Sequence, residues 1–150
     1  VFANQIEYGE HIAISYGDVS GEEPVLVRMH ALNMIADVLG DTTETQFAAG
    51  EKRDRATELH AAMQMIADKG RGVVVIIREP SPTALSRFVQ EREGKPMSKP
   101  ISELRQYGIG AQILLELGVH NMVLLTNTRR TIVGLDGYGL NLVAQEPLPT

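Results

Sequence analysis

The sequence predicts an α/β protein, a single domain over residues 1–150 in which helices flank a mixed β-sheet. Strand-like and helix-like segments alternate from residue 54 to the end of the chain, as in an α/β sandwich. The run GVVVII at residues 72–77 is typical of a strand buried on both faces, covered by helices and parallel to a neighbour. With 43% hydrophobic and 22% charged residues, a chain of 150 residues can build one hydrophobic core.

Strand patterns occur in five places. Residues 11–16 alternate between apolar and polar side chains, and so do residues 25–30. In the second of these segments Val25, Val27 and Met29 share one side. Short apolar runs predict three further strands, at residues 72–77, 122–126 and 140–143.

Helical patterns fill the intervals. The strongest covers residues 54–69, which Gly70 ends, and its apolar stripe is Ala56, Leu59, Met63 and Ile66. Shorter or less regular patterns predict helices at residues 32–39, 83–92, 104–117 and 129–135. The polar stretches at residues 41–52 and 94–100 are predicted to be loops.

Charge and hydropathy exclude several classes of function. The chain has 14 Lys+Arg against 19 Asp+Glu, a net charge of −5, which argues against non-specific nucleic-acid binding. No apolar run approaches the roughly 18 to 20 residues that span a bilayer, and the N-terminal residues lack a signal-peptide pattern. We therefore expect a cytoplasmic protein without a membrane or nucleic-acid partner. Val1 suits a piece of a longer chain, and equally an artefact of cloning.

Cysteine is absent, which excludes disulfides, thiol chemistry and any metal site held by cysteine. The four histidines, at positions 11, 30, 60 and 120, are too scattered for a metal-binding pair on one helix. His60 is interpreted as a residue of a helix surface. His30 ends a strand close to Arg28, which is a better position for a functional site.

Basic residues near the ends of strands and helices suggest an anion site. Residues 126–130 (TNTRR) follow a buried strand, where backbone N–H groups and basic side chains can hold a phosphate in an open α/β sheet. The cluster at residues 52–55 (KRDR) is either a solvated helix end or an anion contact. The residues alone therefore predict an anion pocket near Arg28, Arg105 and Thr126.

Several longer phrases closely resemble the GTP cyclohydrolase II family. In the C-terminal half these are RQYGIGAQIL at 105–114, LGV at 117–119, LLTN at 124–127 and GLDGYGL at 134–140. Upstream, PVLVRMH at 24–30 and residues 59–72 resemble the early strands and the central helix of that family. The resemblance covers nearly the whole chain. It implies a GTP cyclohydrolase II-like mixed sheet and a place in riboflavin biosynthesis, where these enzymes hydrolyse GTP at C8 and release formate and pyrophosphate.

The resemblance also implies one zinc ion held by three cysteines, and here this chain departs from the family. Asn33 stands at the first ligand position. The other two positions correspond to Arg53 and Arg55 or, counted from the other side, to Glu44 and Gln46. Zinc lowers the pKa of its bound water from about 15.7 to roughly 7, which supplies hydroxide at neutral pH. Without thiolate ligands we expect no zinc cofactor and no ring opening.

The nucleotide-binding phrases of the family are only partly retained. The family's Arg-x-Glu-Gly-Arg phrase is replaced by REPSP at 78–82, and a shorter loop at 93–99 replaces the segment that lies over the purine. Glu103 and Arg105 occupy the places of an acidic residue and of an arginine implicated in attack at the α-phosphate. Thr126 matches a threonine that contacts the triphosphate, whereas the lysine expected near Thr131 is missing. The candidate residues are therefore Glu103 and Arg105 for catalysis, and Arg28, Arg105 and Thr126 for phosphate binding.

The leading hypothesis is a GTP cyclohydrolase II-like domain that has lost ring opening and keeps a structural, dimerising or regulatory role. The alternatives are an active cyclohydrolase with atypical ligands and a sensor that binds GTP or phosphate without turnover. Because the family is dimeric, we expect a homodimer, with residues 2–14 as part of the contact. Such domains are also fused to 3,4-dihydroxy-2-butanone 4-phosphate synthase, which makes this a possible partner domain.

Overall fold

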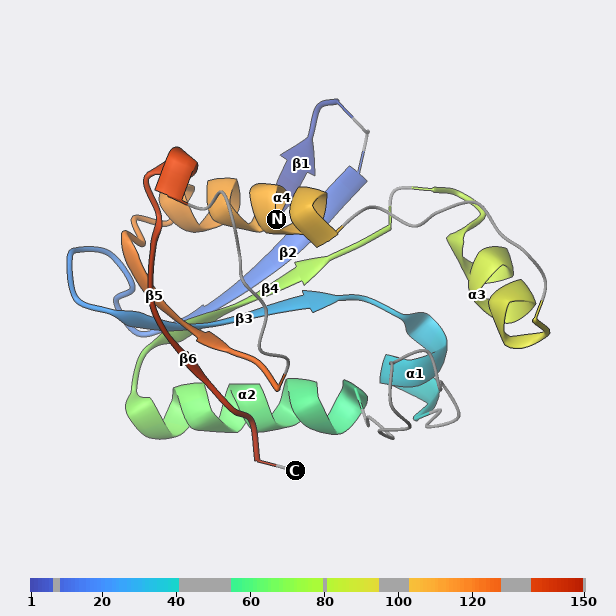
Figure 1. The fold of residues 1–150 in the computed structure, drawn as a ribbon, viewed down its shortest axis with the longest axis horizontal. Coiled ribbons are helices and arrows are strands. Elements are labelled where there is room, and N and C mark those ends of the chain that lie inside the picture. Colours follow the sequence, from blue (N-terminus) through green and yellow to red (C-terminus); the bar gives the residue numbers. More distant parts are fainter. Residues whose placement is uncertain (7–8, 41–54, 80, 95–102, 128–135, 150) are drawn as a thin grey trace.

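A computed structural model describes residues 1–6, 9–40, 55–79, 81–94, 103–127 and 136–149. Six strands form one sheet in the order β1-β2-β4-β3-β5-β6 (Figure 1). The strands are β1 (Phe2–Asn4), β2 (Gly9–Tyr16), β3 (Val25–Ala31), β4 (Gly72–Ile77), β5 (Asn121–Leu125) and β6 (Asn141–Glu146). The helices are α1 (Met34–Leu39), α2 (Arg55–Lys69), α3 (Ala84–Arg92), α4 (Glu103–Glu116) and the short η1 (Asp136–Tyr138).

The sheet is mixed, as the sequence predicts. β3 pairs in parallel with β4 and β5, and β5 pairs in parallel with β6. β2 runs antiparallel to both β1 and β4. The β-branched run of β4 is the buried strand expected for it, and its parallel neighbour is β3.

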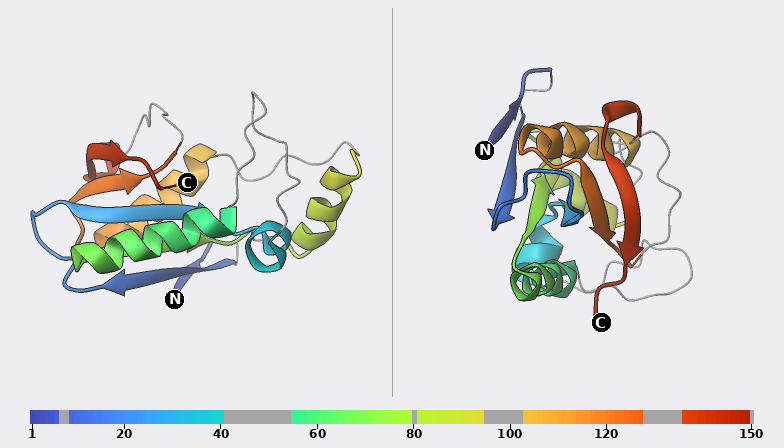
Figure 2. Two further views of the ribbon diagram at one scale, coloured as in Figure 1. Left: turned by 90° about the horizontal axis from the view of Figure 1, so that it is seen from below. Right: turned by 90° about the vertical axis from the view of Figure 1, so that its left-hand side faces the viewer.

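Helices α4 and α2 lie on opposite faces of the sheet, so the fold has three layers (Figures 1 and 2). The larger core lies between the sheet and α4, and includes Val27 and Val75 from the strands and Leu114 from the helix. The second core lies between the sheet and α2, where Ala62 and Ile66 pack with residues such as Val74. Alternation along β3 and β4 thus divides their side chains between two apolar layers.

The predicted elements are found with modest shifts of their ends. The helix predicted at 129–135 and the loop at 41–52 lie outside the described residues, as does nearly all of the loop at 94–100. One detail of α2 is wrong: Met63 is 42% exposed, whereas Glu58 and Ala62 are buried. The buried stripe of α2 includes a glutamate, which a search for apolar residues passes over.

The N-terminal segment, which is predicted to take part in a homodimer contact, forms β1 and β2 of the sheet. Phe2 lies opposite His11 in the β1–β2 pair and packs against the larger core, and His11 is buried. On the other face of β2, Ile12, Ile14 and Tyr16 remain 39%, 44% and 56% exposed.

None of the helices that the structure describes combines the length and the hydropathy that spanning a membrane requires.

Candidate functional site

Arg28 lies in the middle of β3 and forms a nearly buried ion pair. Alternation along β3 places it on the same side as Leu26, which belongs to the core beneath α2. Its Nη2 donates to Oε2 of Glu58 on α2 at 3.0 Å, and each of the two side chains is 11% exposed. Its Nη1 donates to the carbonyl oxygen of Leu125 at 3.1 Å. The guanidinium therefore joins β3 to α2 and to the end of β5.

The same network holds the C-terminal segment. Nδ2 of Asn127 approaches Oε1 of Glu58 at 3.5 Å, and Oδ1 of Asn127 accepts from the Leu148 N–H at 2.7 Å. Thr126 stands next to this network, and its N–H donates to the Glu146 carbonyl at 2.9 Å. Arg28 and Thr126 are thus close to one another, but within a set of interactions that fixes the chain end.

Arg105 is exposed in the first turn of α4. This helix covers the opposite face of the sheet from α2, with which Arg28 pairs through Glu58 (Figure 1). It lines a pocket to which neither Arg28 nor Thr126 contributes. The side chain of Glu103 lies outside the described residues. Of the three residues predicted to bind phosphate, the structure therefore brings together Arg28 and Thr126, and it places Arg105 elsewhere.

Asn33, at the first ligand position of the implied zinc site, is the N-cap of α1. Its Oδ1 accepts from the N–H groups of Ile35 and Ala36 at 3.1 and 3.2 Å, and the residue is buried. Asparagine is a favoured N-cap because its side chain satisfies helix donors that otherwise have no partner. The only side-chain oxygen at this position is therefore engaged by the helix.

His30 and Asp37 form a buried pair beside this cap. Nε2 of His30 lies 2.8 Å from Oδ2 of Asp37, which also accepts from the Asn33 N–H at 2.8 Å. The two side chains are 1% and 3% exposed. Residues 44, 46, 53 and 54 and the side chain of Arg55 lie outside the described part of the chain. Among the residues that the structure describes, no group of three His, Cys, Asp or Glu side chains could hold a metal. Of the positions that correspond to the family's zinc ligands, the structure thus describes the side chain of Asn33 alone, and its oxygen caps α1.

Tyr107, on α4, packs against the larger core. Burial raises the pKa of its phenol, and the positive charge of Arg28 acts in the opposite direction. A neutral phenol is therefore the form at neutral pH.

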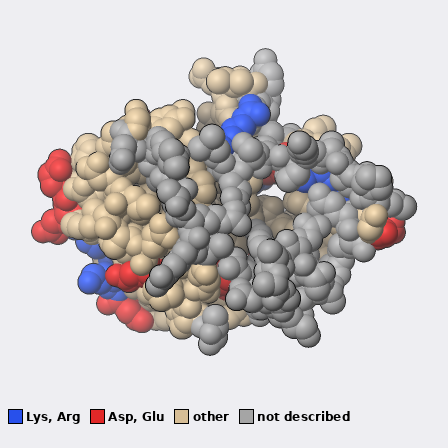
Figure 3. All heavy atoms as spheres, in the orientation of Figure 1, with Lys and Arg blue, Asp and Glu red and all other residues tan. Residues whose placement is uncertain are grey.

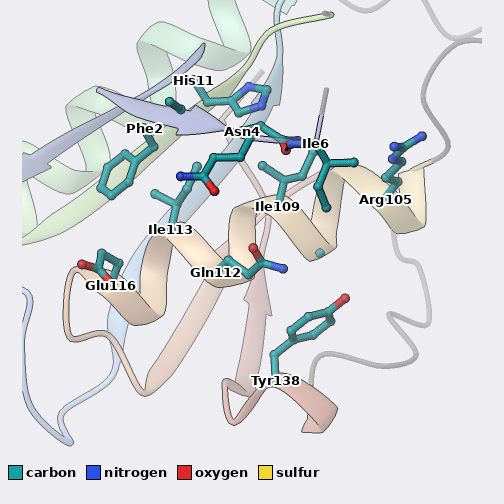
Figure 4. A pocket seen from close by; sticks show the side chains of 13 residues that line it. Phe2, Asn4, Ile6, His11, Arg105, Ile109, Gln112, Ile113, Glu116 and Tyr138 are labelled. Atoms are coloured by element: carbon teal, nitrogen blue, oxygen red, sulfur yellow. Dashed lines mark hydrogen bonds between the residues drawn. The ribbon is translucent and has the colours of Figure 1, made fainter. Parts of the chain in front are cut away.

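A pocket that the sequence did not indicate lies between β1 and α4 (Figure 4). It is lined by β1 with the residues that follow it, by His11 of β2, and by residues of α4 that include Arg105, Ile109, Ile113 and Glu116. In the sequence His11 is one of four scattered histidines, and β1 is too short to show an alternating pattern. The signal that could have found the pocket is the apolar and polar spacing of α4, in which residues 105, 109, 112 and 116 share one face.

The surface of the described residues shows no concentration of positive charge on the face drawn in Figure 3. There the lysine and arginine side chains lie apart from one another, between neutral and acidic ones. Arg71, which is partly buried, is paired with the exposed Glu23 at 2.7 Å.

Comparison with known proteins gives one consistent result. A family model described as GTP cyclohydrolase II matches residues 1–147. The chain is similar to the riboflavin biosynthesis protein RibBA of Bacillus subtilis, with 39% identity, and to the proteins of the same name from Bacillus velezensis (37%) and Bacillus cereus (36%). Each match covers 98% of this chain and 38% of the relative. The chain thus spans well under half the length of these curated relatives.

Proposed function

The chain belongs to the GTP cyclohydrolase II family, and from this premise we propose that it is a domain of a riboflavin-biosynthesis protein that does not open the GTP ring. It serves instead in assembly or regulation of that protein. The first part is supported by the relatives described as riboflavin biosynthesis proteins, because the match to them covers 98% of this chain. The second part rests on the chemistry of the metal site.

The proposal rests on the role of Asn33 as the N-cap of α1. A thiolate at this position would bind zinc, whereas the amide oxygen of Asn33 accepts from two N–H groups of α1. An asparagine that turned to a metal would leave these donors without their cap, at a cost of about 1 kcal/mol. Because the whole chain contains no cysteine, no thiolate can replace it. A zinc-bound hydroxide, which ring opening needs, has no support among these residues.

The state of Arg28 supports the same conclusion on the phosphate side. Its guanidinium pairs with Glu58, and both side chains are almost buried. A triphosphate that used Arg28 would compete with this carboxylate and would bring further negative charge beside it. We therefore assign to Arg28 the task of joining β3 and α2, and retain Arg105 as the anion-binding side chain of the domain.

Assembly is supported by the exposed face of β2. Ile12, Ile14 and Tyr16 lie in register with Ile76, Val74 and Gly72 of β4, and so extend the apolar face that α2 covers farther along the sheet. Isologous contacts between copies often use such surfaces. We propose that this face of β2 forms a homodimer contact. The match covers only 38% of each relative, so the rest of a relative's length can hold the fused 3,4-dihydroxy-2-butanone 4-phosphate synthase domain that the family resemblance implies.

The test is a turnover assay with GTP, magnesium and added zinc, in which released formate is measured. The matched control is a family member with all three cysteines, assayed under the same conditions. We expect formate from the control and none above background from this chain. Formate release at a rate within about a hundredfold of the control would contradict the proposal and favour an active enzyme with atypical ligands. GTP binding without formate release would favour the sensor.

A further inference from the structure

His11, one of the residues that line the pocket between β1 and α4, carries a buried hydrogen-bond donor without a partner in the described part of the chain. His11 is 1% exposed, and its Nδ1 accepts from the Arg78 N–H at 3.1 Å. The neutral ring therefore carries its proton on Nε2. This atom is buried and has no hydrogen-bond partner in the described part of the chain. A buried donor in this state costs free energy, because it has lost its water without gaining an acceptor.

The pocket is large enough for a small molecule. Its volume is about 790 Å³, within the range of sites that bind small molecules. One wall is the face of α4 that carries Ile109 and Ile113, and the opposite wall is β1 with the residues that follow it (Figure 4). Phe2 adds an aromatic ring to these apolar walls. The lining thus offers apolar contacts to the flat body of a ligand, beside polar side chains such as Asn4 and Gln112.

The pocket has a positively charged side chain at one end and a negatively charged one at the other. Arg105 stands near the beginning of α4 and Glu116 at its end, and both line the pocket. Eleven residues of helix separate them by about 16 Å, at 1.5 Å per residue. A carboxylate is attracted to the Arg105 end and repelled from the Glu116 end. A ligand with one carboxylate therefore enters in one orientation.

We propose that this pocket binds a small aromatic carboxylic acid, whose carboxylate pairs with Arg105 and whose second acceptor, a carbonyl or ring nitrogen, takes the Nε2–H of His11. An arginine holds a carboxylate through two parallel hydrogen bonds, which makes it a strong anchor. The acceptor satisfies the donor that the protein leaves buried. This proposal rests on the anion-binding role given to Arg105 above, whereas none of the residues of the site belongs to the Arg28 network or the Asn33 cap.

The probe for the test is para-acetylbenzoate, which carries both groups. Two relatives of the probe each lack one: para-ethylbenzoate has no second acceptor, and para-acetylbenzyl alcohol has no negative charge. Binding is measured by titration calorimetry, and the pocket is located by ¹H–¹⁵N shifts of β1 and α4. We expect the full probe to bind about tenfold more tightly than either relative, which is the effect of one hydrogen bond or ion pair.

Two variants of His11 separate its nitrogen atoms. His11→Asn keeps an acceptor for the Arg78 N–H and removes the Nε2 donor, whereas His11→Gln keeps a donor near the Nε2 position. We expect His11→Asn to abolish the preference for the acetyl over the ethyl compound and His11→Gln to retain it. Arg105→Gln should abolish the preference for the carboxylate over the alcohol.

Circular dichroism and the dispersion of the amide spectrum show whether each variant folds. The proposal is overturned if para-acetylbenzoate does not bind the wild-type protein, if the shifts lie away from β1 and α4, or if folded His11→Asn keeps the full preference. Because the readout is binding of a benzoate, formate release from GTP in the other assay would leave this result unaffected.

Discussion

Arg28 shows how one side chain can match the pattern of a ligand site and still serve the fold. Its charge is compensated by Glu58, and its second Nη binds a backbone carbonyl at the end of β5. Buried ion pairs add little net stability compared with apolar residues, but the loss of one partner leaves a costly charge. The pair is therefore best tested by removing one member and then both.

We predict that Arg28→Met lowers the free energy of unfolding by about 3 kcal/mol, because the Glu58 carboxylate loses the guanidinium that compensates it. The double variant Arg28→Met, Glu58→Met should recover at least half of this loss. Urea titrations of the three proteins measure both effects. A double variant less stable than Arg28→Met would show that the carboxylate is compensated by other groups.

His11 predicts a dependence of stability on pH. Burial, and to a smaller extent the charge of Arg78, lowers the pKa of the His11 imidazole from its usual 6.5. The unfolded chain therefore takes up this proton at a higher pH than the folded protein does. It follows that the contribution of His11 is complete above pH 6.5 and falls as pH decreases from 6.5 toward the folded pKa.

Urea titrations between pH 8 and pH 5 measure this loss, with His11→Asn as the control. This pH range spans the usual titration of a histidine side chain. The wild-type protein should lose more stability than the variant over this range. Equal losses would mean that the imidazole titrates in the folded protein as it does in the unfolded chain.

The sequence reveals such residues only in part. The position of Arg28 near His30 on one strand follows from alternation, and both side chains are indeed buried or nearly so. The partner Glu58 is 30 positions away, and nothing in the local pattern of α2 marks it. The burial of His11 depends on β1, three residues long, which only tertiary pairing stabilises.

At the scale of elements, the approach of α2 to the sheet is set by Gly72. A Cβ at this position would lie 2.6 Å from Cγ1 of Ile66 and 2.8 Å from the carbonyl oxygen of Leu26. The branched side chain of Ile66 and the backbone of β3 cannot move aside without shifting the helix. The first residue of β4 therefore determines how closely α2 packs.

We predict that Gly72→Ala lowers the free energy of unfolding by about 2 kcal/mol through overpacking. Gly137→Ala is the matched control, because no atom of the described residues lies within 4 Å of its added Cβ. Thermal unfolding of both variants measures the difference. A Gly72→Ala protein as stable as the control would show that α2 can move from the sheet at little cost.

The elements with strong local patterns were predictable. The β-branched run of β4 and the alternation of β3 indicate buried strands, and the structure places both at the centre of the sheet. The apolar stripe predicted for α2 includes Met63, which is exposed, and leaves out Glu58, which is buried. A buried carboxylate becomes predictable only when its partner is known, and Arg28 is on a different element.

At the scale of the whole molecule, two apolar layers hold α4 and α2 on the sheet, and the β2 face remains uncovered. We predict that the protein is a homodimer at micromolar concentration and that Ile14→Lys dissociates it. A stable contact needs about 1,000 Å² or more of buried surface, and a lysine at its centre opposes that burial. Val143→Lys is the control, since Val143 is 54% exposed on β6, at the opposite edge of the sheet.

Light scattering gives the mass of each protein over a dilution series. The wild type and Val143→Lys should have twice the chain mass of 16.4 kDa, and Ile14→Lys the mass of one chain. A monomeric wild type would leave the domain without the proposed contact. A dimeric Ile14→Lys would place the contact on another face.

We propose that a GTP cyclohydrolase II fold persists here without the metal centre of its family. Elemental analysis of the purified protein, loaded with zinc and then dialysed against metal-free buffer, tests it most directly. Structural and catalytic zinc sites with three or more protein ligands retain their metal under such treatment. We predict zinc well below stoichiometric amounts, because Asn33 caps α1 and no cysteine is present. About one zinc ion retained per chain would contradict the claim.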